Sequence, residues 1–126
     1  MRVLIADAQK DLGISLAALV ERCGHEVLQV VGSGLDAIQA YTRLQPDLVL
    51  LDYSLPRLNG ATAARMILAK DPAARIVIVS AVAPAGQLAE SGAIAILSKP
   101  VELDKLYAAL YDAAPPPNEP PEKELF

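Results

Sequence analysis

Cysteine and histidine are scarce in this 126-residue chain, which holds one of each, Cys23 and His25. A single cysteine excludes an internal disulfide bond and fits a reducing compartment. A single histidine lacks the partners that a histidine metal site requires. We expect His25 to lie in a turn, and Cys23 to extend an apolar helical stripe made of Leu12, Leu16, Leu19 and Val20.

Clustered basic residues and long apolar runs are also missing. The 11 lysines and arginines are scattered and the formal net charge is −4, which argues against a nucleic-acid surface. No apolar stretch approaches the roughly 18 residues of a membrane-spanning helix. We therefore expect a soluble, cytoplasmic protein that binds neither nucleic acid nor a membrane through this segment.

Four short apolar runs do stand out, over residues 3–6, 48–51, 76–79 and 93–97. They lead to Asp7, Asp52, Ser80 and Lys99. Runs of this length without alternation predict strands buried on both faces, as in a parallel sheet between helices. Ligand sites of such sheets lie beyond the carboxyl ends of the strands. We therefore expect these four polar residues at one edge of one sheet.

Strand and helix patterns alternate five times over residues 1–113. Helices are expected over about 11–23, 35–44 and 61–70, with a further strand over 26–31. A short fourth helix is expected to start near Pro84, and the last helix is expected to carry Leu103, Leu106, Tyr107 and Leu110 on one face. The pattern predicts one α/β domain, a doubly wound five-stranded parallel sheet with right-handed crossovers.

The four polar residues also make a chemical set. One polar residue at a strand end is ordinary, and a lone Ser80 would be read as no more than the end of a buried strand. Together they supply a nucleophilic carboxylate, a second acid for a cation, a hydroxyl donor and a fixed positive charge. Phosphoryl transfer to a carboxylate needs those parts.

Residues 46–60, with the sequence PDLVLLDYSLPRLNG, resemble the phosphoacceptor strand and following loop of the receiver domains of bacterial two-component response regulators. Ser80-Ala81 and Lys99-Pro100 match two further motifs of that family, and the similarity runs from residue 2 to about residue 113. The resemblance implies a flavodoxin-like strand order 2-1-3-4-5 and a signalling role rather than an enzymatic one. It implies that Asp52 accepts a phosphoryl group from a histidine kinase or a histidine phosphotransfer protein. Ser80 and Lys99 would contact that group, and at rest the ammonium of Lys99 would contact the carboxylate of Asp52. The Lys99-Pro100 bond is often cis in the family. The output would be a downstream protein partner or an output domain outside this segment.

The acidic pair of the family is incomplete here. Ala8 stands where receivers usually carry the second acid, the direct Mg²⁺ ligand. We expect weak Mg²⁺ binding by Asp7, Asp52 and the backbone carbonyl of Ser54, since a hard cation loses affinity with each carboxylate removed. Gln9 and Asp11 are conceivable substitutes, and both are better explained as a loop residue and a helix N-terminal residue.

Two further departures from the family pattern concern the change in conformation that follows phosphorylation. Ile96 replaces a residue that is commonly aromatic in receivers and whose side chain changes rotamer on phosphorylation. Only residues 81–91 separate Ser80 from Gly92, so the fourth helix should be short. The surface that receivers often use for docking or dimerisation is then altered.

Residues 114–126 form a segment rich in proline and glutamate. We interpret it as a solvated tail or a linker, outside the domain over residues 1–113. Leu125 and Phe126 keep a second interpretation open, in which two apolar residues on an extended tether insert in a groove.

Three other functions are alternatives to phosphoryl acceptance. The main one is a receiver fold that binds partners without being switched by phosphate, which Ala8, Ile96 and the short fourth helix favour. A haloacid dehalogenase-like phosphatase is remote, because Ser54 occupies the place of its general acid and no cap domain fits in the chain. A flavodoxin is disfavoured because residues 7–11 lack the loop rich in serine, threonine and glycine that FMN needs.

Overall fold

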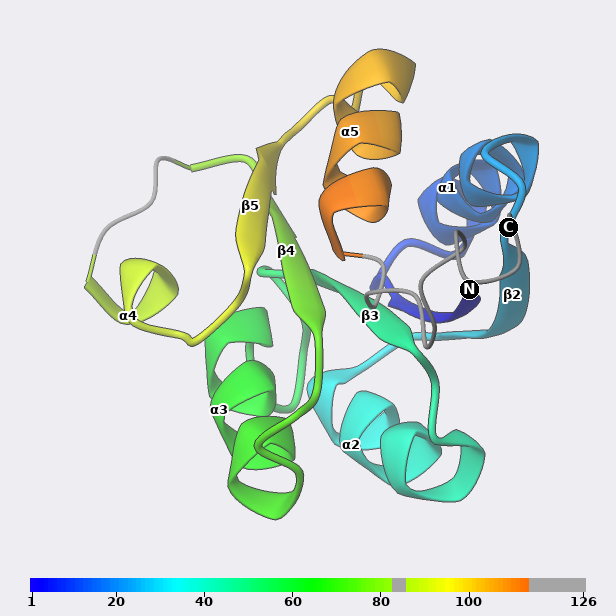
Figure 1. Ribbon diagram of the computed structural model, residues 1–126. Coiled ribbons are helices and arrows are strands. Elements are labelled where there is room, and N and C mark those ends of the chain that lie inside the picture. The colour runs from blue at the N-terminus through cyan, green and yellow to red at the C-terminus, as the bar shows by residue number, and fades with distance from the viewer. Residues whose placement is uncertain (83–85, 114–126) are drawn as a thin grey trace, which may run out of the picture.

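The computed structural model describes residues 1–82 and 86–113. Strands and helices alternate along them as the sequence patterns predict (Figure 1). The strands are β1 (Arg2–Ala6), β2 (Glu26–Val31), β3 (Leu48–Asp52), β4 (Ile76–Ser80) and β5 (Ala95–Ser98). The helices are α1 (Lys10–Arg22), α2 (Gly34–Leu44), α3 (Gly60–Lys70), α4 (Gly86–Ala89) and α5 (Leu103–Ala113).

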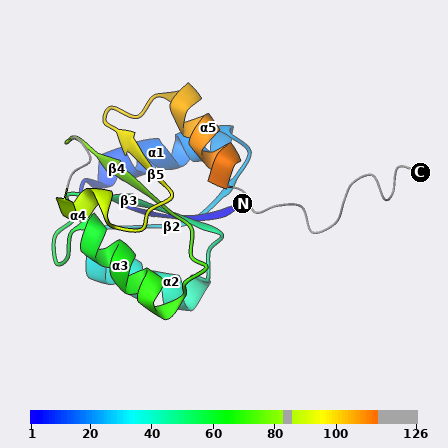
Figure 2. The same ribbon diagram turned by 60° about the vertical axis from the view of Figure 1, so that its left-hand side comes forward.

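The strands form one parallel sheet in the order β2-β1-β3-β4-β5, which confirms the predicted doubly wound arrangement. Helices α1 and α5 cover one face of the sheet, and α2 and α3 cover the other (Figure 2). Two apolar clusters result, one on each face. Strands β1, β3 and β4 contribute to both clusters because their side chains alternate between the faces.

The central strands are buried as predicted, and the outer strand β5 is not. Every residue of β3 and β4 is buried. Ala95, Ile96 and Leu97 of β5 are only partly buried, Ser98 is exposed, and Ile94 just before the strand is 51% exposed. The expectation that residues 93–97 are buried on both faces is therefore wrong. The reason is that β5 has β4 as its one neighbour and that α4, with 4 residues, covers little of the sheet.

The predicted apolar helix faces hold in part. Leu16, Val20, Leu106 and Leu110 are buried in the cluster between α1, α5 and the sheet, and Cys23 packs against that cluster as expected. Leu12, Leu103 and Tyr107 are exposed by 47%, 39% and 56%, so each predicted apolar stripe is buried only in part. They lie at the flanks of the buried stripes, and helical spacing alone does not tell how far a neighbouring element extends over each flank.

Helices α2 and α3 begin after residues whose side chains cap them. The side chain of Ser33 accepts the amide hydrogen of Asp36 at 3.0 Å, and the side chain of Asn59 accepts that of Thr62 at 2.9 Å. His25 lies between α1 and β2, as expected for a turn residue, and its Nδ1 is 2.8 Å from the amino group of Met1.

The short fourth helix is confirmed, since α4 spans 4 residues and begins at Gly86. Its predicted start at Pro84 falls outside the described residues, and so does the segment 114–126. Within the described residues, no helix is both long and apolar enough to cross a membrane.

Candidate functional site

The carboxyl edge of the sheet brings the predicted site residues into one region. Asp7 follows β1, Asp52 ends β3, Ser80 ends β4 and Lys99 follows β5. The register between β4 and β5 pairs Ser80 with Ser98, and the amide of Lys99 donates to the carbonyl of Ser80 at 2.9 Å. Asp7, Asp52 and Ser80 are each at most 6% exposed, although they end or follow strands.

An ion pair forms the centre of this edge. The Lys99 Nζ atom lies 3.0 Å from Asp52 Oδ2, and the two side chains are 27% and 7% exposed. The Lys99-Pro100 peptide bond is cis, as the family resemblance implied. The predicted contact between the ammonium of Lys99 and the carboxylate of Asp52 at rest is confirmed.

Asp7 is a second buried carboxylate beside this pair. Its Oδ1 accepts the backbone amide of Gln9 at 2.8 Å, where α1 begins. Burial raises the pKa of Asp7 above its ordinary value of 3.8, and the negative charge of Asp52 raises it further, while the Gln9 amide and the Lys99 ammonium act in the opposite direction. The site therefore holds more negative charge than its one lysine balances.

A divalent cation fits this imbalance. The carboxylates of Asp7 and Asp52 are hard oxygen donors of the kind that Mg²⁺ prefers, and the loop after β3 is held close because the amide of Ser54 donates to Asp52 Oδ1 at 3.1 Å. The methyl group of Ala8 supplies no ligand, and the described residues contain no cluster of three or more histidine, cysteine, aspartate or glutamate side chains. The donor set thus fits Mg²⁺ with fewer anionic ligands than the usual receiver site.

The hydroxyl of Ser80 is engaged with the loop that follows β4. Its Oγ accepts the amide hydrogen of Val82 at 3.0 Å and lies 3.1 Å from the carbonyl oxygen of Val82, to which it donates. Ser80 is therefore at the predicted edge, but in this arrangement its hydroxyl closes a local turn. A contact between Ser80 and a phosphoryl group remains a prediction.

Two glycines position the loop after Asp52, and the sequence analysis missed their role. A Cβ atom on Gly60 would lie 2.5 Å from the carbonyl oxygen of Asp52, and one on Gly34 would overlap the carbonyl oxygen of Leu58. Both are backbone atoms, so the close approach requires glycine. The signal was present in the sequence as Gly34 and Gly60 at the start of two helices, but only the tertiary packing shows what they touch.

The residue that stands at the family's usual aromatic position lies at the edge of the apolar core. Ile96 is partly buried and packs against the cluster on the α2 and α3 face. Its side chain has neither a ring nor a hydroxyl that could move toward the surface. An aromatic rotamer switch is therefore not available at this position, as the sequence indicated.

Taken together, the fold and this edge define a class, the flavodoxin-like α/β domain with an aspartate–lysine pair beyond the carboxyl ends of its parallel strands. The sequence matches the response regulator receiver domain family over residues 3–111. The chain therefore belongs to that family, as its motifs predicted. Receiver domains are signalling modules of two-component systems.

Known relatives agree with this assignment. The chemotaxis protein CheY of Listeria monocytogenes is 31% identical over 117 residues, which are 90% of this chain and 98% of that protein. The transcriptional regulatory protein PdtaR of Mycobacterium tuberculosis is 32% identical over 112 residues, which are 86% of this chain and 54% of that protein. Among solved structures, a two-component response regulator of the LuxR family from an Aurantimonas species has a TM-score of 0.82 at 28% identity. The match covers 88% of this chain and 82% of that protein's chain.

Proposed function

We propose that this receiver domain accepts a phosphoryl group on Asp52 from a histidine kinase or a histidine phosphotransfer protein and signals through protein contacts. The observation that carries the proposal is the 3.0 Å pair between Asp52 and Lys99 beside the buried carboxylate of Asp7. An aspartate in such a place has a nucleophilic oxygen, and the adjacent ammonium is matched to the charge of an incoming phosphoryl group.

The transfer step follows from these groups. A carboxylate oxygen of Asp52 attacks phosphorus, a P–O bond forms, and the P–N bond to the donor histidine breaks with its electron pair returning to the imidazole, which takes up a proton. Lys99 then holds an oxygen of the phosphoryl group instead of the free carboxylate. Asp7, Asp52 and the carbonyl of Ser54 would hold Mg²⁺, which when bound neutralises phosphoryl oxygens.

Ser80 has to change partner for the domain to respond in the manner of its family. Its hydroxyl must leave Val82 to donate to a phosphoryl oxygen. The exchange replaces a neutral hydrogen bond, worth about 1 kcal/mol net, by one to a charged acceptor, worth roughly 1.5–3 kcal/mol. The loop that follows β4 would then be released from Ser80, and this movement is the signal that we propose partners read.

The proposal is tested by incubating the protein with a small phosphodonor and Mg²⁺ and measuring the intact mass. The parent should gain one phosphoryl group and Asp52→Asn should gain none. Asp104→Asn is a matched control, because Asp104 is an exposed carboxylate in the first turn of α5. Labelling of Asp52→Asn to the level of the parent would refute the assignment of Asp52.

A second candidate function is partner binding that does not depend on phosphorylation. The observation that favours it is the local engagement of Ser80 with Val82 together with an aliphatic Ile96 and a four-residue α4. The two functions differ in their response to a beryllofluoride phosphate mimic. If the amide NMR signals of Ser80, Val82 and their neighbours do not move when the mimic binds, the phosphorylation-independent function is the correct one.

A further inference from the structure

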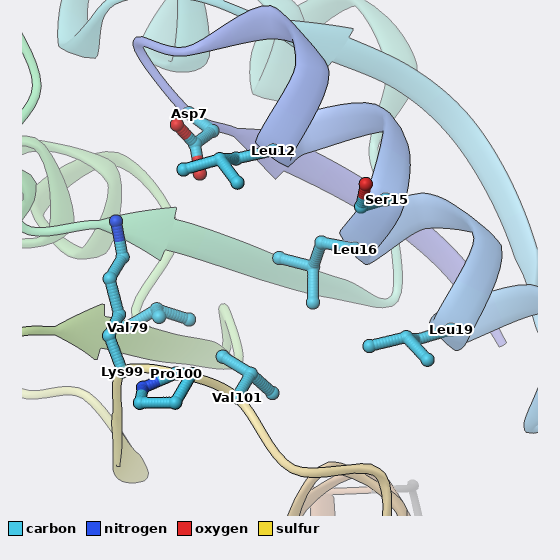
Figure 3. A pocket seen from close by; sticks show the side chains of 9 residues that line it. All are labelled: Asp7, Leu12, Ser15, Leu16, Leu19, Val79, Lys99, Pro100 and Val101. Carbon is cyan, nitrogen blue, oxygen red and sulfur yellow. The ribbon is translucent and has the colours of Figure 1, made fainter.

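An apolar groove of about 480 Å³ runs along α1 beside the proposed phosphorylation site. Its walls come from the helix and from the segment that joins β5 to α5. Figure 3 shows the side chains of α1 on one side of it and those of the joining segment on the other. The apolar lining includes Leu12, Leu16, Leu19, Pro100 and Val101, and the polar end is formed by Asp7 and Lys99.

This groove leaves apolar surface without a cover in the described structure. Leu12 is 47% exposed although it lies beside the buried Leu16. A concave apolar surface of this size is large enough to take two side chains of a docking segment. An uncovered groove of this kind favours a ligand that brings apolar side chains without a bulky charged group.

The chain carries such a segment beyond α5. Leu125 and Phe126 are the only apolar side chains other than proline within residues 115–126, and Phe126 is the single phenylalanine of the protein. The intervening stretch holds five prolines and three glutamates. Prolines favour an extended chain, which loses less conformational entropy on docking than a flexible linker would.

The tether is long enough to reach the groove. Helix α5 has 11 residues and is therefore about 16 Å long at 1.5 Å per residue. Its first residue, Leu103, follows Val101 of the groove by two positions. The tail leaves α5 at the opposite end, and residues 114–124 span about 34 Å when extended at 3.1 Å per residue. The tail thus covers the length of α5 about twice.

The outer surface of α5 offers a path between the two points. Leu103, Tyr107 and Tyr111 follow one another at intervals of four residues and are exposed by 39%, 56% and 73%. Residues at this spacing lie in one row along a helix. Prolines in an extended segment pack well on aromatic side chains, as in the recognition of proline-rich peptides.

We propose that residues 114–126 fold back along α5 and insert Leu125 and Phe126 into the groove formed by α1 and the segment that joins β5 to α5. Because the segment is part of the same chain, its effective concentration at the groove is in the millimolar range, which favours it over a free partner of equal affinity. Asp7 and Lys99 belong both to the groove and to the phosphorylation site. The docked segment therefore lies against Asp7 and Lys99 and competes with any protein that approaches the phosphorylation site from α1.

Fluorine NMR of the full chain tests this docking. Biosynthetic replacement of phenylalanine by 4-fluorophenylalanine labels Phe126 alone. We expect its resonance to differ in position and width from that of a synthetic peptide with the sequence 114–126. Leu12→Glu should move the resonance to the position of the peptide. Ile94→Glu is the matched control, because Ile94 is similarly exposed, at 51%, and does not line the groove, and it should leave the resonance unchanged.

Three results would overturn the proposal. The parent resonance could coincide with that of the peptide, which would mean that the groove serves another protein. The two glutamate variants could behave alike. The shift could depend on protein concentration, which would assign the groove to the tail of a second copy. The measurement does not use phosphorylation, so it stays informative for a protein that accepts no phosphoryl group.

Discussion

Replacing Lys99 by methionine removes the positive charge at the centre of the site while keeping a side chain of similar length. In the parent, Lys99 Nζ and Asp52 Oδ2 are 3.0 Å apart. Two unit charges 3.0 Å apart attract by about 1.4 kcal/mol at a dielectric constant of 80 and by about 5.5 kcal/mol at an effective value of 20. Desolvation of the nearly buried carboxylate offsets part of this attraction.

The net cost of Lys99→Met follows from that balance. A hydrogen bond to a charged group contributes roughly 1.5–3 kcal/mol, and we expect the free energy of unfolding to fall by about this amount near pH 8. The variant also loses the ammonium that lowers the pKa of Asp7. The pKa of Asp7 then rises further, and its ionised form opposes folding more strongly, so the destabilisation should shrink as the pH falls from 8 toward 3.8, the ordinary pKa of an aspartate.

Urea unfolding of parent and variant across this pH range measures the effect. Lys105→Met is the matched control, because Lys105 pairs with Glu102 at 3.4 Å on the surface of α5 with the two side chains 69% and 60% exposed. Such a pair contributes about 0.3–0.5 kcal/mol. Equal losses in the two variants, or a loss for Lys99→Met that stays the same as the pH falls from 8 toward 3.8, would refute the reasoning. The same variant should also bind beryllofluoride more weakly than the parent.

Three other substitutions test the surroundings of this pair. Ala8→Asp restores the missing acid and should tighten Mg²⁺ binding at least about 10-fold in a calorimetric titration, since even changes outside the direct ligands lower metal affinity roughly 10- to 100-fold. Equal affinities of parent and variant would show that another group already completes the site. Asp7→Asn should raise the free energy of unfolding at pH 7 without Mg²⁺, because burial raises the pKa of Asp7 and its ionised form opposes folding above that pKa. That gain should vanish in urea titrations as the pH approaches 3.8, the ordinary pKa of an aspartate. Gly60→Ala should lower the free energy of unfolding by about 1–3 kcal/mol, because the new Cβ would lie 2.5 Å from the carbonyl oxygen of Asp52; a thermal melt unchanged from the parent would contradict that contact.

The order of strands and helices could be predicted because burial on both faces leaves a strong local signal. Residues 48–52 and 76–80 are apolar up to their last residue, and the structure buries each of them. The same signal fails at residues 93–97, since a run of apolar residues does not tell whether a strand lies in the centre or at the edge of a sheet. The exposure of Leu12 and Tyr107 has the same cause, as it depends on what packs beside each helix.

The candidate site shows the same division between what the local sequence predicts and what the packing decides. The sequence by itself determined that Asp7, Asp52, Ser80 and Lys99 stand at the carboxyl edge, because each ends or follows a strand and parallel strands share that edge. Only the tertiary structure decided the distance and the burial of the predicted Lys99–Asp52 pair, which joins residues 47 positions apart, and that Ser80 turns to Val82 instead. A strand places a residue at an edge, but the direction of its side chain depends on the register of the neighbouring strands and on the loops beyond them, whose close contacts the sequence does not encode locally.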